Sequence, residues 1–392
     1  MKMLNPLLET LLDLLSLSNW KDKRHKLTLA WMIYGLIQVR EINLPEWIPF
    51  VSSRARKAQS TERRFSRWVN NDRINVEDIY SPLIKQALHD WGKEVLYVAL
   101  DTSMLWNKFC QIRICVIYRG RSVPLVWKTI KHGSSSIKFS EYKDLLEQAK
   151  TLLPTNKRII FLADRGFANV KLMSFLSQEL SWNWRIRCKV GYNIYRPSKQ
   201  KNKRFCKVKI TAQYGHSRFY HRVYLTDEYY GEIHLAFARH SGKKETWLIV
   251  SDEPTSLETF KEYGLRFDIE EGFKDDKSGL FELELSKLRD ANALTRLYTV
   301  IAVATLFLVS QGVDVVKRGI RCEIDPHWKR SLSYLKIGLR YVALALVRGY
   351  QFVKKIILPS TADPELVRSS KGKLSTHSRI DRFQSSVVIF TK

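Results

Sequence analysis

Two short apolar runs that each end in an aspartate constrain the fold more than any other feature of this sequence. Residues 95–100 are almost wholly apolar and lead into Asp101, and residues 159–163 are apolar and lead into Asp164. A run that is apolar on both faces is typical of a central strand covered on both sides. We expect both carboxylates at the carboxyl edge of an α/β sheet, where such folds place their sites. Each Asp taken alone is as readily a turn or helix-cap residue.

Short strand-like and helical segments alternate around these two runs. Three β-rich runs lie between residues 94 and 130, and a helical stretch at 141–153 precedes the strand that ends at Asp164. A helix near 169–180 and a strand at 183–190 follow. The first three strands are close enough for an antiparallel meander, whereas strands that alternate with helices are usually parallel. The sequence therefore predicts a mixed α/β sheet.

Residues 190–245 interrupt this alternation with Tyr- and Arg-rich β-type runs and no helix between them. We interpret them as a β-rich insertion subdomain with a basic entry, because residues 185–209 contain ten Lys or Arg and no acid. The predicted organisation has five parts: a helical region at 1–90, the first part of the α/β core at 91–189, the insertion at 190–245, the second part of the core at 246–320, and C-terminal helices with a basic, loosely ordered tail at 321–392.

The charge of the chain indicates an anionic partner. There are 66 Lys and Arg against 39 Asp and Glu, a formal net charge of +27, and so basic a surface attracts polyanions. Nucleic acid is the leading candidate and an anionic membrane surface the alternative. The longest apolar run, residues 297–309, is too short to span a bilayer and favours a buried helix. We therefore expect a cytoplasmic protein without a membrane partner.

Five cysteines without a CxxC pair make a zinc site or a disulfide framework improbable. A basic segment near residue 60 is the best candidate for a DNA-binding helix. Phe65 and Trp68 lie three residues apart and give the helix an apolar face, while Arg63, Arg64 and Arg67 supply phosphate contacts. The alternative is a solvated helix with a basic face.

A third carboxylate stands on a polar stripe of the helix predicted near residues 263–277. At about 100° per residue, one narrow stripe contains Tyr263, Arg266, Glu270 and Lys277. An apolar stripe beside it contains Leu265, Ile269 and Phe273. Glu271 lies about 100° away from Glu270 and is a poorer candidate, whereas Lys274 lies near the stripe and could add a contact. The alternative is an ordinary i,i+4 salt bridge between Arg266 and Glu270 on a solvated helix.

The spacing Tyr-x2-Arg-x3-Glu-x6-Lys resembles the signature of the DDE transposases of bacterial insertion sequences, in the branch named for its Tyr-Arg-Glu-Lys motif. The segment ALDTS around Asp101 and the segment LADRGF around Asp164 resemble the regions of the first and second Asp of that family. The resemblance covers about residues 50–320. The first 50 residues and the tail resemble nothing that we can name.

The resemblance implies a ribonuclease H-like core in which Asp101, Asp164 and Glu270 hold two Mg²⁺ (or Mn²⁺) ions. Carboxylate ligands suit such hard cations, and two metals can activate the attacking oxygen and stabilise the leaving one. The implied reaction is cleavage of double-stranded DNA at terminal inverted repeats, followed by strand transfer to target DNA in a synaptic dimer. By analogy, Tyr263, Arg266 and Lys277 would bind phosphates or the distorted DNA end. The protein would act on the bacterial nucleoid.

Several relatives hold a flipped base with an aromatic residue of the insertion. Trp182, Trp184 and Trp247 are the candidates here, although core packing is the favoured interpretation for each. Two alternative functions stay open: a catalytically inactive DNA-binding regulator of transposase descent, and a nuclease on the same fold without strand transfer.

Overall fold

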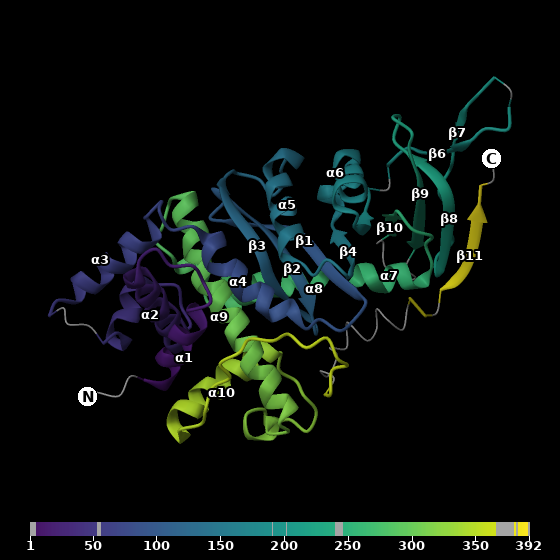
Figure 1. Ribbon diagram of the computed structural model, residues 1–392. Helices are drawn as coiled ribbons and strands as arrows, with labels where there is room; N and C mark the ends of the chain where they lie inside the picture. Colours follow the sequence, from purple (N-terminus) through teal and green to yellow (C-terminus); the bar gives the residue numbers. More distant parts are fainter. Residues whose placement is uncertain are drawn as a thin grey trace.

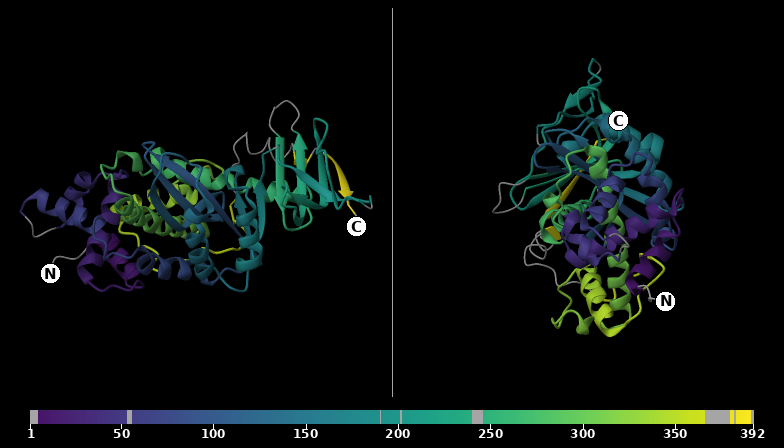
Figure 2. Two further views of the ribbon diagram at one scale, coloured as in Figure 1. Left: turned by 90° about the horizontal axis from the view of Figure 1, so that it is seen from above. Right: turned by 90° about the vertical axis from the view of Figure 1, so that its left-hand side faces the viewer.

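The protein is an elongated molecule with helices at one end, a long sheet through its centre and a β-rich arm at the other end (Figures 1 and 2). The computed structural model describes residues 5–52, 56–189, 191–200, 202–239, 246–365, 380–381 and 383–390. The mixed α/β class predicted from the sequence is confirmed.

The N-terminal end is helical, as predicted. Its elements are α1 (Pro6–Leu15), α2 (Lys23–Val39), η1 (Leu44–Phe50), α3 (Ala58–Val69) and α4 (Val76–His89). Side chains of Asn5, Asp22 and Asn75 accept backbone N–H bonds and so begin α1, α2 and α4. Helix α3 buries Phe65 and Trp68 against the neighbouring helices, so its predicted apolar face is confirmed.

The central strands follow the predicted order and directions. They are β1 (Val95–Leu105), β2 (Phe109–Tyr118), β3 (Arg121–Lys131), β4 (Arg158–Ala163) and β5 (Asn183–Arg187). Strands β1, β2 and β3 form an antiparallel meander, while β4 runs parallel to both β1 and β5. The parallel pairing sets Leu100 beside Ala163, and it therefore brings Asp101 and Asp164 to the same edge.

The β-rich arm continues the same sheet. It contains β6 (Ile194–Pro197), β7 (Phe205–Lys207), β8 (His216–Leu225), β9 (Tyr230–Arg239) and β10 (Thr246–Ser251). Because β10 pairs antiparallel with both β5 and β9, the strand order is β3-β2-β1-β4-β5-β10-β9-β8-β6-β7. The strands expected as an insertion therefore extend the core sheet instead of forming a sheet of their own, and the boundaries of the predicted parts stay a prediction.

Helices cover both faces of the sheet. Helices α5 (Lys143–Leu152) and α6 (Val170–Phe175) pack on one face, and α7 (Leu257–Gly264) and α8 (Phe267–Lys274) pack on the other. Shorter turns of helix are η2 (Phe139–Glu141), η3 (Arg165–Phe167), η4 (Leu176–Leu180), η5 (Asp275–Gly279), η6 (Leu283–Leu285) and η7 (Arg321–Glu323).

The apolar segment at 297–309 lies within α9 (Ala291–Lys317), a core helix against β3, α2 and α10 (Tyr334–Arg348). Within the described residues α9 alone is long and apolar enough to cross a membrane, but 94% of its apolar window is buried inside the protein. The expectation of a loosely ordered tail needs correction, because β11 (Gln384–Ile389) pairs parallel with β8. Residues 366–379 of that tail lie outside the described residues.

Candidate active site

The first two predicted carboxylates lie next to each other at the edge of the sheet. Asp101 belongs to β1, and its Oδ1 accepts the backbone N–H of Thr102 at 2.8 Å. Asp164 directly follows β4 and begins η3. Their position follows from the parallel register of β1 and β4, which supports the reasoning from two apolar runs.

The third carboxylate reaches this edge from α8, through a shared arginine. Arg266 donates from Nη1 to Asp101 Oδ2 at 3.2 Å and from Nη2 to Glu270 Oε1 at 2.6 Å. Its Nε donates to the hydroxyl of Tyr263 at 3.1 Å, and that hydroxyl in turn donates to Asp164 Oδ1 at 3.4 Å. The network therefore connects all three predicted carboxylates through Arg266 and Tyr263.

Burial changes the electrostatics of this network. Burial raises the pKa of Asp101 to about 6, although the Arg266 guanidinium and the Thr102 amide work to lower it. Burial acts to lower the pKa of Arg266, but the neighbouring Tyr263, Asp101 and Glu270 together hold it above its ordinary value. A charged guanidinium thus serves as the counterion of the carboxylates.

The structure distinguishes the two adjacent glutamates as the helical stripe predicted. Glu270 faces Arg266, whereas Glu271 bonds Lys274 at 2.8 Å and lies 3.8 Å from Arg121. The i,i+4 pair of Arg266 and Glu270 exists, but the Arg266 side chain is only 3% exposed and also holds Asp101. A solvated surface salt bridge therefore does not describe this pair.

The predicted single helix is broken into three pieces. Helix α7 ends at Gly264, α8 begins at Phe267, and a π turn, η5, follows α8. The π turn changes the direction of Lys277, whose Nζ donates to Met104 O at 2.6 Å and pairs with Glu284 at 3.0 Å. Lys277 thus bonds β1 three residues from Asp101, and its ammonium group pairs with Glu284 instead of the three predicted carboxylates.

The predicted DNA-contacting residues of this helix differ in exposure. Tyr263 and Arg266 are buried, with their polar atoms on the carboxylate network. Lys274 is exposed and pairs with Glu271. A phosphate contact by any of these residues, or by Lys277, stays a prediction.

Sequence reasoning missed the buried ion pair that holds α8 on the sheet. Arg113 of β2 contacts Asp276 and the hydroxyl of Tyr298, and its guanidinium lies 3.9 Å from the centre of the Phe273 ring. Tyr298 also donates to Asp276 Oδ2 at 2.7 Å. The sequence feature that could have predicted this ion pair is the arginine in the middle of the apolar run CQIRICVIY. A buried arginine requires a partner.

Gly272 lets α8 approach this ion pair closely. A Cβ atom there would lie 2.3 Å from Ser122 Oγ and 2.9 Å from Arg113 Nη2, whereas a Cβ at Gly264 would meet nothing within 4 Å. Of these two glycines, only Gly272 is therefore required by packing, and it lies two residues after Glu270.

The three tryptophans considered as candidates for holding a flipped base lie in the core. Trp182, Trp184 and Trp247 are all buried, and the ring of Trp247 lies 5.6 Å from that of Tyr263 in an edge-on contact. This agrees with core packing, the interpretation favoured for all three.

Two of the three basic residues predicted on α3, Arg64 and Arg67, line a cavity of about 570 Å³ between α2 and α3. Its other charged or titratable lining residues are Arg24, His25 and Asp22, and Asp22 pairs with Arg24. Arg63 and Arg67 are exposed, while Nε and Nη2 of Arg64 are buried without a hydrogen-bond partner among the described residues. Burial lowers the pKa of Arg64. An unpartnered guanidinium beside a basic cavity favours an anionic ligand.

The donor set of the site suits a hard divalent cation, since three carboxylates supply only oxygen ligands. The arrangement differs from a ready metal site, because within the described residues no three Asp, Glu, His or Cys side chains lie close enough to hold an ion. Arg266 stands between Asp101 and Glu270. These carboxylates can share an ion only if Arg266 releases at least one of them.

A family model matches this chain, and a solved structure is similar to it. The family model described as "Transposase DDE domain" matches residues 106–307, which include Asp164 and Glu270 and begin shortly after Asp101. No curated protein matches. Among solved structures, the piggyBac transposase synaptic complex with hairpin DNA is similar, with a TM-score of 0.42 and 10% identity over 95% of this chain and 82% of that chain.

Proposed function

The chain belongs to the transposase DDE-domain family, whose model covers just over half of it, and on this premise we propose that it excises and inserts its own insertion sequence. In this proposal the protein cleaves double-stranded DNA at terminal inverted repeats and joins the freed strand to target DNA. The branch with the Tyr-Arg-Glu-Lys signature is part of the proposal. The observation that carries it is the convergence of Asp101, Asp164 and Glu270 on Arg266 and Tyr263.

We assign the three carboxylates as ligands of two Mg²⁺ or Mn²⁺ ions. Bound ions would supply charge stabilisation and an activated attacking oxygen. Arg266 balances the carboxylates before the ions bind. When it releases a carboxylate, its N–H groups become available to a phosphate oxygen, which a guanidinium can bind with two parallel bonds.

The remaining parts of the proposal concern DNA. Helix α3 would approach the backbone with Arg63 and Arg67, and the cavity beside Arg64 would receive a phosphate. Lys274 is exposed near the carboxylates and is assigned to the same DNA. Cutting two transposon ends together requires two copies of the chain, so a synaptic dimer acting on the bacterial nucleoid in the cytoplasm is included.

The decisive experiment incubates the protein with Mg²⁺ or Mn²⁺ and DNA that carries the flanking inverted repeats. We expect nicking at the repeat ends that is lost in Asp101→Asn and in Glu270→Gln. Glu271→Gln is the matched control, because Glu271 is the next residue and pairs with Lys274 away from the network; it should keep the activity.

Other outcomes identify the alternatives. DNA binding without cleavage in either metal would contradict the enzyme and support an inactive regulator of transposase descent. Cleavage without joining, and without preference for the repeats, would support a nuclease instead. Equal loss of activity in Glu270→Gln and Glu271→Gln would contradict the assignment of Glu270.

A further inference from the structure

The loop between η7 and α10 presents a tryptophan to solvent. Trp328 is 99% exposed, whereas the other ten tryptophans of the chain are buried or half-buried. The loop lies beyond the residues that match the family model. A large apolar ring left entirely in water is a common anchor of a binding surface, provided that its backbone is fixed.

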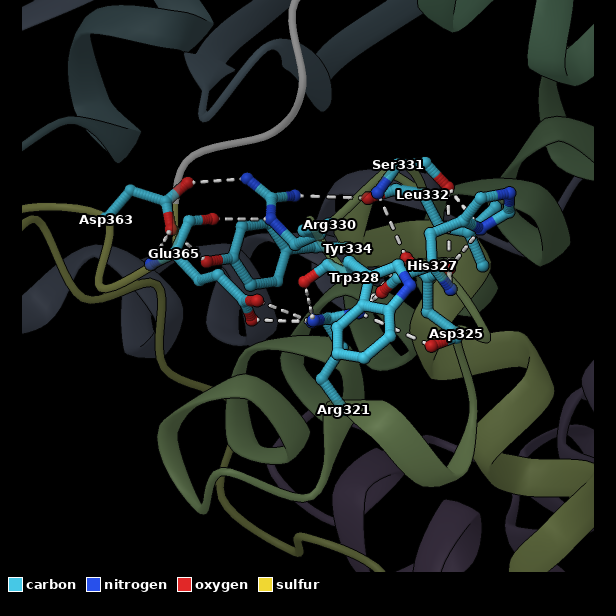
Figure 3. Close-up of polar contacts among 10 residues, drawn as sticks. All are labelled: Arg321, Asp325, His327, Trp328, Arg330, Ser331, Leu332, Tyr334, Asp363 and Glu365. Atoms are coloured by element: carbon cyan, nitrogen blue, oxygen red, sulfur yellow. Dashed lines mark hydrogen bonds and ion pairs between the residues drawn. The ribbon is translucent and has the colours of Figure 1, made fainter.

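A buried arginine fixes the backbone under Trp328. The Arg321 guanidinium donates to the carbonyl oxygens of Asp325, His327 and Trp328 at 3.3, 2.8 and 3.1 Å. It also pairs with both carboxylate oxygens of Glu365 at 2.7 Å (Figure 3). One cation thus connects three carbonyl groups of the loop to Glu365, which lies beyond α10.

Two more buried charged side chains, Asp325 and Arg330, also hold the backbone of the loop. The Asp325 carboxylate is fully buried and accepts the backbone N–H groups of His327 at 3.2 Å and Ser331 at 3.0 Å. Arg330, which is 1% exposed, donates to Asp363 Oδ2 at 2.7 Å and to Glu365 O at 2.6 Å. Trp328 therefore projects from a preorganised scaffold (Figure 3), and binding through it costs little ordering entropy.

The charge around the loop favours a polyanion. Residues 314–365 contain ten Lys or Arg and five Asp or Glu. Each of the five acids pairs with an arginine of the same segment. Lys317, Lys329 and Lys355 are exposed and have no ion-pair partner within the described part of the chain. Lys329 directly follows Trp328.

We propose that Trp328 stacks on an unpaired base of DNA while Lys329 contacts a neighbouring phosphate. The inference rests on the proposed function, since it takes DNA as the ligand of the protein. An indole offers a flat ring to a base of any sequence, and an adjacent cation follows the backbone. Paired bases inside a duplex hide their faces, so the site prefers single-stranded DNA or a frayed end.

Fluorescence provides a direct test, because Trp328 is the only fully exposed tryptophan of the chain. Acrylamide quenching is measured with a 20-nucleotide single strand, its blunt duplex, or the duplex with an unpaired overhang. We expect the single strand and the overhang to protect Trp328 fluorescence from quenching by acrylamide. Trp328→Phe should lose this quenchable part of the fluorescence. In a binding titration, Trp328→Ala should weaken single-strand and overhang binding about tenfold and blunt-duplex binding less than twofold.

Trp127→Phe is the matched control, because Trp127 is buried in β3; it should keep both the protection and the affinity. Binding of DNA by the wild-type protein without protection of Trp328 would overturn this inference and leave the proposed function standing. Absence of binding to all three DNAs would overturn this inference, whereas the proposed function is decided by cleavage of the inverted-repeat DNA. Protection that increases with protein concentration in the absence of DNA would overturn the DNA assignment and identify a second copy of the chain as the partner.

Discussion

The close approach at Gly272 gives a prediction that links packing to the position of Glu270. In Gly272→Ala the new Cβ would lie 2.3 Å from Ser122 Oγ, about 1.1 Å nearer than the 3.4 Å of an ordinary contact. Overpacking of this kind costs about 1–3 kcal/mol. Because Ser122 and Arg113 belong to β3 and β2 of the central sheet, we expect α8 to move instead of these strands.

Gly264→Ala is the matched control, since it makes the same substitution in the adjacent helix without a clash. Urea unfolding should show Gly272→Ala to be about 1–3 kcal/mol less stable than Gly264→Ala. Adding Ser122→Ala removes the nearest atom and should recover more than half of that difference. The contact of 2.9 Å to Arg113 Nη2 remains, so recovery should be incomplete.

Cleavage assays then test the connection to the site. At a temperature where both variants are folded, Gly272→Ala should cleave about 10–100 times more slowly than Gly264→Ala, because shifts of up to 1 Å in a catalytic group have effects of this size. Equal stability of the two variants would refute the packing argument. A destabilised Gly272→Ala with wild-type cleavage would refute the claim that this contact positions Glu270.

Three further predictions follow from other charged groups. Asp276→Asn leaves buried Arg113 without its anion and should lower the free energy of unfolding by about 3–5 kcal/mol, whereas Asp144→Asn, in an exposed pair, should cost at most about 1 kcal/mol in the same urea titration. Arg64→Met should weaken DNA binding and reduce the slope of log K against log salt by about 0.9, as for one lost phosphate contact; an unchanged slope would exclude that contact. Hydrogen bonds from Ser331 and His327 outweigh burial and lower the pKa of Asp325 to about 2, so its stabilisation is present above about pH 4 and is lost as the pH falls towards 2. Thermal melting of Asp325→Asn should therefore differ from wild type at pH 6 and converge with it near pH 2.

Local patterns were enough to predict the two aspartates. Both Asp101 and Asp164 end apolar runs, and the periodicity of a helix chose Glu270 over Glu271 without any knowledge of tertiary contacts. The predicted positions of these side chains agree with the structure, because strand alternation and helical rotation are properties of a few neighbouring residues; their catalytic role stays a prediction. The parallel register of β1 and β4 then placed the two aspartates together.

Features that depend on distant parts of the chain were not predicted. The partner of Arg113 is Asp276, 163 residues away, and no local pattern identifies it. The predicted direction of the Lys277 side chain was wrong, because a π turn replaces the regular helix at Asp275–Gly279. The π turn changes the rotation per residue. Likewise, the pairing of β11 with β8 joins segments far apart in sequence, so the tail looked unstructured.

The charge distribution predicts the order in which DNA and divalent cations bind to the site. The chain as a whole has a formal net charge of +27. The network of Asp101, Asp164, Glu270 and Arg266, however, contains three carboxylates and one guanidinium. When all are ionised, this group is negative and repels a DNA phosphate at short range. In the proposed function, basic side chains such as those on α3 would bind DNA without metal, whereas a phosphate would approach Asp101 only after cations had neutralised the carboxylates. Binding of DNA should therefore persist in EDTA, while protection of the scissile phosphate should require a divalent ion.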